Sequence, residues 1–314
     1  MIEDSPEIPK GIKTALRKNN LVVFLGAGVS RLLGCASWEE LAKNLVDCCY
    51  ETEIDGKKLI PLRVKEILCS GNNYKKTISI CKNILKDNEK KDKFYKVIEE
   101  SLEAKDSSKK IKIYEELKKL IYSAYPDNEG FFITTNIDTH FTDKFNENNV
   151  VYNPINNKVP MRELKLYHLH GSLKDRDSIV LTVDNYIKTY GTKEIKNFLG
   201  RTFRNFVVLF IGYGLTELEV LDFLLTEFKH SDGETKHFIL LPYRKNEMNM
   251  QEYDQLYYKD LGINVIGYSK ENGYEQLYEV IKNWNKEIAQ EPKDMVKEIS
   301  DFKEEIGRIN KRTI

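Results

Sequence analysis

The sequence predicts an α/β protein with a doubly wound, mostly parallel sheet and a helical insertion. Short apolar runs typical of strands recur along the chain, and several of them alternate with amphipathic helical patterns. A charge-rich helical stretch interrupts this alternation after about residue 50. Alternating strands and helices are typical of a parallel sheet, because each helix returns the chain to the edge at which the strands begin.

The first predicted strand is the dense apolar run at residues 21–25, which ends in Gly-Ala-Gly and therefore enters a tight turn. A helix is predicted soon after it. Ser37 and Glu40 match a capping box, in which each side chain accepts a hydrogen bond from the other residue's backbone amide. Apolar residues then follow at helical spacing. The predicted order is strand, glycine loop, helix.

Residues 51–120 combine charged helical stretches with no clear strand pattern, and we predict that they form a helical insertion subdomain. The flanking residues 11–50 and 121–290 are predicted to form the sheet domain. The strongly charged residues 291–314 are expected to form one C-terminal helix against the body or a partner. Further strands are predicted at residues 131–134, 166–169, 179–182, 206–211, 237–241 and 263–267.

The charge balance argues against a polyanionic partner. The 49 basic and 49 acidic side chains cancel, so the protein lacks the global positive field that attracts nucleic acid or an anionic membrane. The N-terminal residues lack the pattern of a signal peptide, and the apolar runs are too short to span a bilayer. We therefore expect a cytoplasmic protein with no direct nucleic acid or membrane partner.

The five cysteines lie at positions 35, 48, 49, 69 and 81, and no two of them form a Cys-x-x-Cys pair. Paired cysteines at that spacing are typical of structural zinc sites. We therefore expect no zinc and reduced thiols that mostly pack in the interior.

Four segments follow predicted strands, where ligands of open α/β sheets bind. They are Gly-Ala-Gly-Val-Ser at 26–30, Thr-Thr-Asn-Ile-Asp at 134–138, His-Leu-His-Gly-Ser at 168–172 and Gly-Tyr-Gly-Leu-Thr at 212–216. Glycines after a strand let backbone amides approach a pyrophosphate, although they are equally typical of a simple turn. Thr216 with Glu219 also fits a capping box, which needs no ligand.

Two side chains in these segments have the chemistry of a catalytic site. Asn136 carries a carboxamide that can donate and accept, so it could fix a water or a ribose hydroxyl. Its neighbours Thr135 and Asp138 could instead cap a helix beginning near Thr139. His170 lies at a strand end beside a glycine, and an imidazole with a pKa of about 6.5 can accept a proton at neutral pH. The alternative is that it packs with His168 as a hydrogen-bonded pair beside the sheet.

Taken in chain order, the four segments resemble the motif series of the sirtuin superfamily. The resemblance implies a Rossmann-like NAD site, with Asn136 and Asp138 at the nicotinamide and its ribose and His170 as the base. It places later loops near Tyr243 and Tyr268 at the adenosine half. It also implies that the phosphates are surrounded by Gly26, Ala27, Gly28 and Ser30. Further NAD-binding residues that it implies are Thr135, Gly212, Tyr213 and Gly214.

The sequence departs from the sirtuins that deacylate proteins. Those enzymes carry a zinc module and a Pro-Asp-Phe-Arg stretch after the first glycine loop, where this chain has Cys-Ala-Ser-Trp at 35–38. It looks instead like the sirtuin-like NADases of bacterial anti-phage defence, which hydrolyse NAD to nicotinamide and ADP-ribose and so cause abortive infection. That branch implies a homo-oligomer and a trigger. The length of the chain favours a separate activating partner, such as a ring-shaped motor ATPase, over a fused sensor.

Two other functions fit the same pocket. One is an NAD-dependent protein deacylase or ADP-ribosyltransferase, which the missing zinc module and the altered loop make less favourable. The other is a sensor that binds NAD or ADP-ribose without turnover and gates a partner. The presence of both Asn136 and His170 favours the hydrolase.

Overall fold

A computed structural model of the chain describes residues 5–105, 112–122, 130–152, 165–215, 218–230, 236–247, 249–271 and 273–290. Its centre is a seven-stranded sheet in the order β5-β6-β4-β1-β7-β8-β9, and every neighbouring pair is parallel. The predicted α/β class with a parallel, doubly wound sheet is therefore confirmed. Its strands are β1 (Leu21–Leu25), β4 (Phe131–Thr134), β5 (Val150–Tyr152), β6 (Leu166–His168), β7 (Val207–Ile211), β8 (His237–Tyr243) and β9 (Ile263–Ser269).

The strands differ from the sequence expectation in two places. Residues 179–182 are buried or nearly so but do not join the sheet, and they lead instead into a helix that Thr182 caps. Strand β5 was not predicted, because three residues are too few to show a periodicity. The C-terminal residues 291–314 and the capping pair Thr216 and Glu219 lie outside the described residues or side chains.

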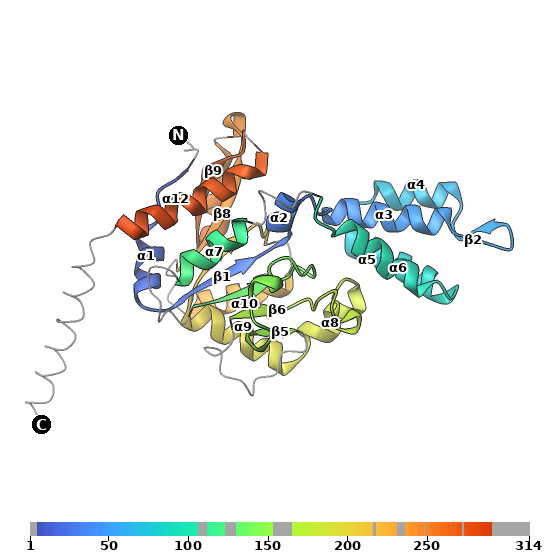
Figure 1. Ribbon diagram of the computed structural model, residues 1–314, viewed down its shortest axis with the longest axis horizontal. Helices are drawn as coiled ribbons and strands as arrows, with labels where there is room; N and C mark the ends of the chain where they lie inside the picture. The colour runs from blue at the N-terminus through green and yellow to red at the C-terminus, as the bar shows by residue number, and fades with distance from the viewer. Residues whose placement is uncertain are drawn as a thin grey trace, which may run out of the picture.

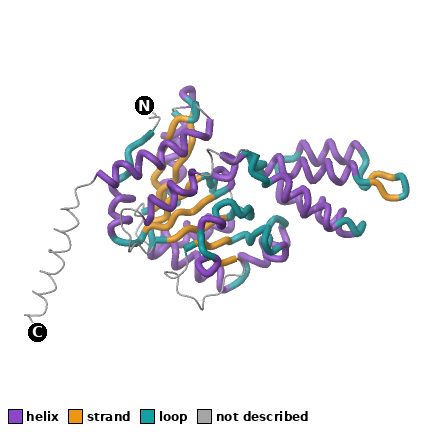
Figure 2. The backbone as a smooth tube through the Cα atoms, in the orientation of Figure 1, coloured by secondary structure: helices purple, strands orange, loops and turns teal. Residues whose placement is uncertain are grey.

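Each face of the sheet is covered by helices, as Figures 1 and 2 show. Strand β1 is buried throughout and contributes alternate residues to two separate apolar layers, Val23 to one and Phe24 to the other. The layer with Val23 contains α1 (Lys10–Arg17), α7 (Lys112–Tyr122) and α12 (Gln276–Gln290). The layer with Phe24 contains α8 (Val183–Tyr190), α9 (Lys193–Asn205), α10 (Leu218–His230) and α11 (Met250–Lys259).

A helical subdomain projects from the sheet domain (Figure 1). It contains α3 (Trp38–Glu51), α4 (Leu62–Ser70), α5 (Tyr74–Asp87), α6 (Lys91–Ser101) and a small hairpin of β2 (Glu53–Ile54) and β3 (Lys57–Lys58). Helix α3 packs on α5 and α6 through an apolar core that includes Leu45, Ile78 and Phe94. This core continues into the sheet domain through Ile137, Ile179 and Leu181. The sequence predicts that the helical insertion begins at residue 51. In the structure, α3 lies before this boundary but packs with the insertion helices that follow it.

The start of α3 has the capping box that the sequence predicts. Glu40 N–H donates to Ser37 Oγ at 3.2 Å, and Ser37 N–H donates to the Glu40 carboxylate at 2.7 Å. The shorter elements are α2 (Ala27–Ser30) and the 3-10 turns η1 (Arg31–Leu33), η2 (Thr142–Lys144), η3 (Glu147–Asn149), η4 (Arg176–Ser178), η5 (Lys245–Glu247) and η6 (Gly273–Glu275). Among the described residues, no helix has the length and apolarity needed to cross a membrane.

The glycine segments after β1 and β7 touch each other, because these two strands are neighbours. Gly28 N–H donates to Gly212 O at 2.8 Å, and Gly26 N–H donates to Ile211 O at 3.0 Å. A Cβ at Gly28 would lie 2.7 Å from Gly212 Cα, and Gly212 itself has a φ of +63°. Glycine is therefore required here for backbone packing, whatever ligand binds.

We expect Gly28→Ala to destabilise the fold by about 1–3 kcal/mol, the usual cost of overpacking a tight interior contact. The new methyl group meets backbone atoms of Gly212, which cannot move aside as a flexible side chain can. Thermal unfolding followed by circular dichroism measures the effect. Gly71→Ala is the control, because the nearest atom to its Cβ would be at 3.7 Å. Equal melting temperatures for the two variants would contradict the prediction.

Two histidines are kept neutral by their burial. His168 Nδ1 donates to Asn136 O at 3.0 Å, and its Nε2 is 2.8 Å from Thr142 Oγ1. His237 Nδ1 accepts from Val208 N–H at 3.1 Å. Burial lowers the pKa of His168 to about 4 and that of His237 to about 3. Protonation of either ring would therefore place a positive charge in a buried site away from water, which is unfavourable.

Acid should destabilise the protein through these two rings. Their folded pKa values lie below the unfolded value of about 6.5, so the unfolded state binds more protons as the pH falls from about 6.5 towards 4. Each ring should then cost up to about 1.4 kcal/mol per pH unit. Urea unfolding at pH 5, 6 and 7 measures this slope, and His168→Gln should reduce it. An unchanged slope in that variant would show that His168 does not carry the effect.

Candidate active site

The carboxyl ends of β1, β4 and β7 form one edge of the sheet, and a cavity of about 700 Å³ lies there. This volume is within the range of about 300–1,000 Å³ usual for small-molecule sites. The helical subdomain contributes Trp38 and Tyr74 to its wall, and the far strands contribute residues 240–242 and Tyr268. The sequence-predicted residues that line it are Ala27, Gly28, Thr135, Gly212, Tyr213 and Gly214.

Charged side chains of both signs also line this cavity. Arg31 and Lys43 are the basic ones, and Glu39 and Glu40 are the acidic ones. Lys43 Nζ lies 2.6 Å from Glu39 Oε1, and both side chains are about half exposed. Arg31 follows the glycine segment directly, so it brings a permanent positive charge to the side of the cavity where the glycine backbones lie.

A smaller cavity of about 40 Å³ adjoins the first and contains the chemistry-bearing side chains. Ser30, Asn136 and Asp138 line it together with apolar side chains that include Leu102 and Leu181. Its volume is close to the share of one water molecule, about 30 Å³. The residues that line both cavities, and so border the passage between them, are Ala27, Ser37, Trp38 and Thr135.

Asn136 is held firmly by one end of its carboxamide. Its Nδ2 donates to Gly26 O at 3.1 Å and to Ser30 Oγ at 2.9 Å, and its backbone N–H donates to Thr134 Oγ1 at 3.0 Å. Its Oδ1 is buried and has no hydrogen-bond partner among the described residues. A buried acceptor without a partner costs about 1–3 kcal/mol, which a donor on a ligand or water would recover.

Ser30 joins Asn136 to Asp138. Its hydroxyl donates to Asp138 Oδ2 at 2.6 Å while it accepts from Asn136 Nδ2, and Tyr114 Oη lies 3.4 Å away. Asp138 also accepts from His140 N–H at 3.2 Å, and burial raises the pKa of its carboxyl. The sirtuin resemblance implies Ser30 near the phosphates, whereas the structure directs its hydroxyl to these two side chains.

His170 lies apart from Asn136 and lines neither of these cavities. Its ring is fully buried, with Nε2 2.9 Å from Tyr190 Oη and the ring centre 5.0 Å from that of Tyr186. His168 faces other partners, because β6 ends at His168 and the chain turns before His170. The two histidines therefore have different partners, whereas strand alternation in the sequence predicts that they share a face.

Sequence reasoning did not single out several residues that shape the site. Trp38 borders both cavities, and its only signal is its place at the start of the capped helix that follows the glycine loop. Tyr190 holds His170 but belongs to α8, a helix that the sequence analysis did not foresee. The expected helix near Thr139 is also absent, and the chain instead forms the short turn η2.

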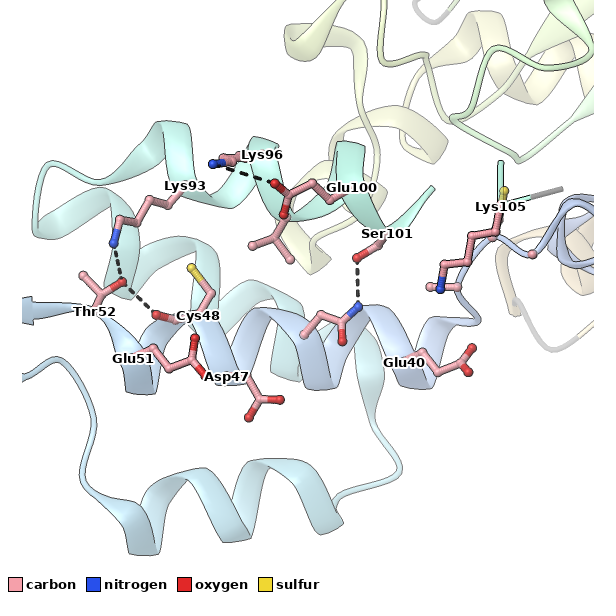
Figure 3. A pocket seen from close by; sticks show the side chains of 15 residues that line it. Glu40, Asp47, Cys48, Glu51, Thr52, Lys93, Lys96, Glu100, Ser101 and Lys105 are labelled. Carbon is pink, nitrogen blue, oxygen red and sulfur yellow. Dashed lines mark hydrogen bonds and ion pairs between the residues drawn. The ribbon is translucent and has the colours of Figure 1, made fainter. Parts of the chain in front are cut away.

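A further cavity of about 740 Å³ lies between α3 and α6 in the helical subdomain, and Figure 3 shows its side chains. Acidic side chains of α3 face basic and acidic side chains of α6 across it. Lys96 Nζ lies 3.7 Å from Glu100 Oε1, and Lys93 Nζ donates to Thr52 Oγ1 at 3.0 Å. Mutual pairing of this kind is typical of a solvated groove, and none of the sequence-predicted site residues lines it.

The described part of the chain holds no group of three or more histidine, cysteine or acidic side chains arranged to bind a metal ion. All five cysteines are free thiols. Cys35 Sγ lies 3.5 Å from His140 Nε2, but burial raises the pKa of Cys35 to about 12, so the thiol stays protonated at neutral pH.

A family model described as a SIR2-like domain matches residues 130–266 of the 314 residues. A search of curated proteins gave no match. The matched range contains Asn136, His170 and the glycine segment at 212–214, while the first glycine segment precedes it. SIR2-like domains are generally NAD-utilising enzymes. The match covers less than half of the chain, and together with the parallel α/β fold it shows that this part of the chain is similar to a SIR2-like domain.

Proposed function

We propose that this protein is an NAD glycohydrolase, which cleaves the nicotinamide–ribose bond of NAD to give nicotinamide and ADP-ribose. The observation that carries the proposal is the buried, unpartnered Oδ1 of Asn136, which lies next to a cavity of ligand size between two glycine segments. The SIR2-like match supports NAD as the substrate. A donor such as a ribose hydroxyl or the attacking water would satisfy Asn136 Oδ1.

The cleavage needs positioning more than covalent help, because nicotinamide leaves as a neutral molecule and the ribose acquires oxocarbenium character. Asn136 suits this task, since Gly26 O and Ser30 Oγ fix its amide nitrogen and so aim its oxygen before substrate binds. Asp138 is proposed to help hold the nicotinamide carboxamide. Its raised pKa allows it to donate a hydrogen bond when it is protonated.

The larger cavity has a volume suited to the dinucleotide, whereas the smaller cavity is too small for the nicotinamide ring. About 40 Å³ beside Asn136 holds roughly one water. Binding therefore requires side chains at the border to move, and Trp38 is the largest residue there. His170, the proposed base, must also come within reach of the ribose or the water. Catalytic contacts often form only in the substrate complex.

We expect Asn136→Ala and His170→Ala each to lower nicotinamide release by about 100-fold or more, as loss of a positioning group or a general base does. Release from purified protein and NAD, followed by liquid chromatography, measures this. Asn44→Ala is the control and should keep full activity, because Asn44 lines the groove between α3 and α6 and neither of the two cavities near Asn136. Circular dichroism must show that each variant is folded. A His170→Ala variant with normal turnover would remove the base from the proposal.

Ser30→Ala separates two roles of that side chain. If Ser30 positions Asn136 and Asp138, its loss should lower kcat by about 10- to 100-fold and change KM by less than about threefold. The reason is that Asn136 Nδ2 loses an acceptor and Asp138 loses a donor. Steady-state kinetics of nicotinamide release gives both constants. A raised KM with an unchanged kcat would instead show a phosphate contact.

The small size of the inner cavity favours a resting state that waits for a trigger. We propose that a separate partner activates the enzyme, as in anti-phage defence by NAD depletion. Nicotinamide release should then rise when the partner encoded beside the gene is added. Saturable NAD binding without release in every mixture would favour the sensor function. Turnover of an acylated peptide would favour a deacylase.

A further inference from the structure

Helix α11 carries an exposed apolar stripe at the edge of the molecule. Met250, Tyr253, Leu256 and Tyr257 are 49%, 64%, 66% and 54% exposed, respectively. The helix packs on β9, which is the last strand of the sheet in the described residues. Single exposed apolar residues are common, but four large ones on a ten-residue helix make a contiguous patch typical of an interaction surface.

The opposite face of α11 is fixed to the protein, so the stripe is a stable surface. Gln255 Oε1 accepts from Val265 N–H at 2.8 Å, and its Nε2 donates to Ile263 O at 3.4 Å. Tyr258 is buried, and Gln251 packs against the backbone of Gly267. These contacts hold the helix in one rotation about its axis. Met250, Tyr253, Leu256 and Tyr257 must therefore point away from the sheet.

We propose that this stripe binds the same stripe of a second copy of the chain, with the two α11 helices antiparallel about a two-fold axis. The argument is self-complementarity, which a two-fold interface demands. This axis reverses the chain direction of the second helix. Residues on one side of the first helix therefore face residues on the same side of the second helix. Tyr253 then meets Leu256 of the second copy, and Met250 meets Tyr257 of the second copy. Both pairs are centred near residue 254.

The charges beside the stripe fit the same arrangement. Glu252 and Lys259 are exposed, lie two helical turns apart and share the side of the helix opposite Met250 and Tyr257. The two-fold axis brings Glu252 of one copy beside Lys259 of the other, and this pair is also centred close to residues 255–256. An axis midway between residues 254 and 255 aligns Tyr253 with Leu256 and leaves the other two pairs offset by about 3 Å along the helices, which long side chains can span.

Charge reversal tests the proposal on the full chain. Glu252→Lys alone and Lys259→Glu alone should each raise the dimer dissociation constant about tenfold or more, because like charges then face each other twice. An equimolar mixture of the two variants should dimerise again, since every facing pair becomes opposite in charge. Light scattering after size exclusion and analytical ultracentrifugation measure the masses. Ile187→Glu, at a 69% exposed residue on α8, is the control and should leave the dissociation constant unchanged.

Leu256→Asp should also give a monomer, and circular dichroism should show that it is folded because the side chain is exposed. A wild-type protein that is monomeric at every concentration would overturn the proposal. It would likewise be overturned by a dimer that withstands all three α11 changes, because its interface would then lie elsewhere. Failure of the mixed variants to reassociate would refute the antiparallel geometry. These outcomes are independent of NAD cleavage.

Discussion

The backbone contact between the glycine segments after β1 and β7 is the constraint on which the site depends. Gly28 and Gly212 lie so close that neither has room for a side chain. This contact holds the two glycine turns together at one edge of the sheet. Residues of both turns line the larger cavity there. It also sets the position of Gly26, whose carbonyl oxygen accepts from Asn136. The glycines thus shape the site through packing before any ligand is considered.

A continuous polar network carries this constraint to the side chains proposed for catalysis. Gly26 and Ser30 hold the Asn136 amide, while His168 holds the Asn136 carbonyl. Asp138 completes the network through Ser30. Every one of these groups is matched except Asn136 Oδ1, and the fold tolerates the cost of that mismatch. A buried polar atom that lacks a partner beside a cavity is a common feature of functional positions.

The sequence predicted the sheet well because buried parallel strands leave dense apolar runs, as at Leu21–Leu25 and Phe131–Thr134. It also predicted which segments meet, because the carboxyl ends of parallel strands share an edge. It did not predict the orientation of His170, since β6 ends two residues earlier and a turn breaks the alternation. Nor did it predict the role of Trp38, because a tryptophan at helical spacing is equally typical of a core.

The helical subdomain contacts the surroundings of both side chains proposed for catalysis, Asn136 and His170. Trp38 of α3 borders the cavity that contains Asn136. On the other side, Ser79 of α5 accepts from Val183 N–H at the start of α8, and Lys75 Nζ lies 3.5 Å from the centre of the Tyr186 ring. Tyr186 in turn packs on His170. One group of helices therefore touches the surroundings of both Asn136 and His170, so the packing of this subdomain is coupled to both side chains.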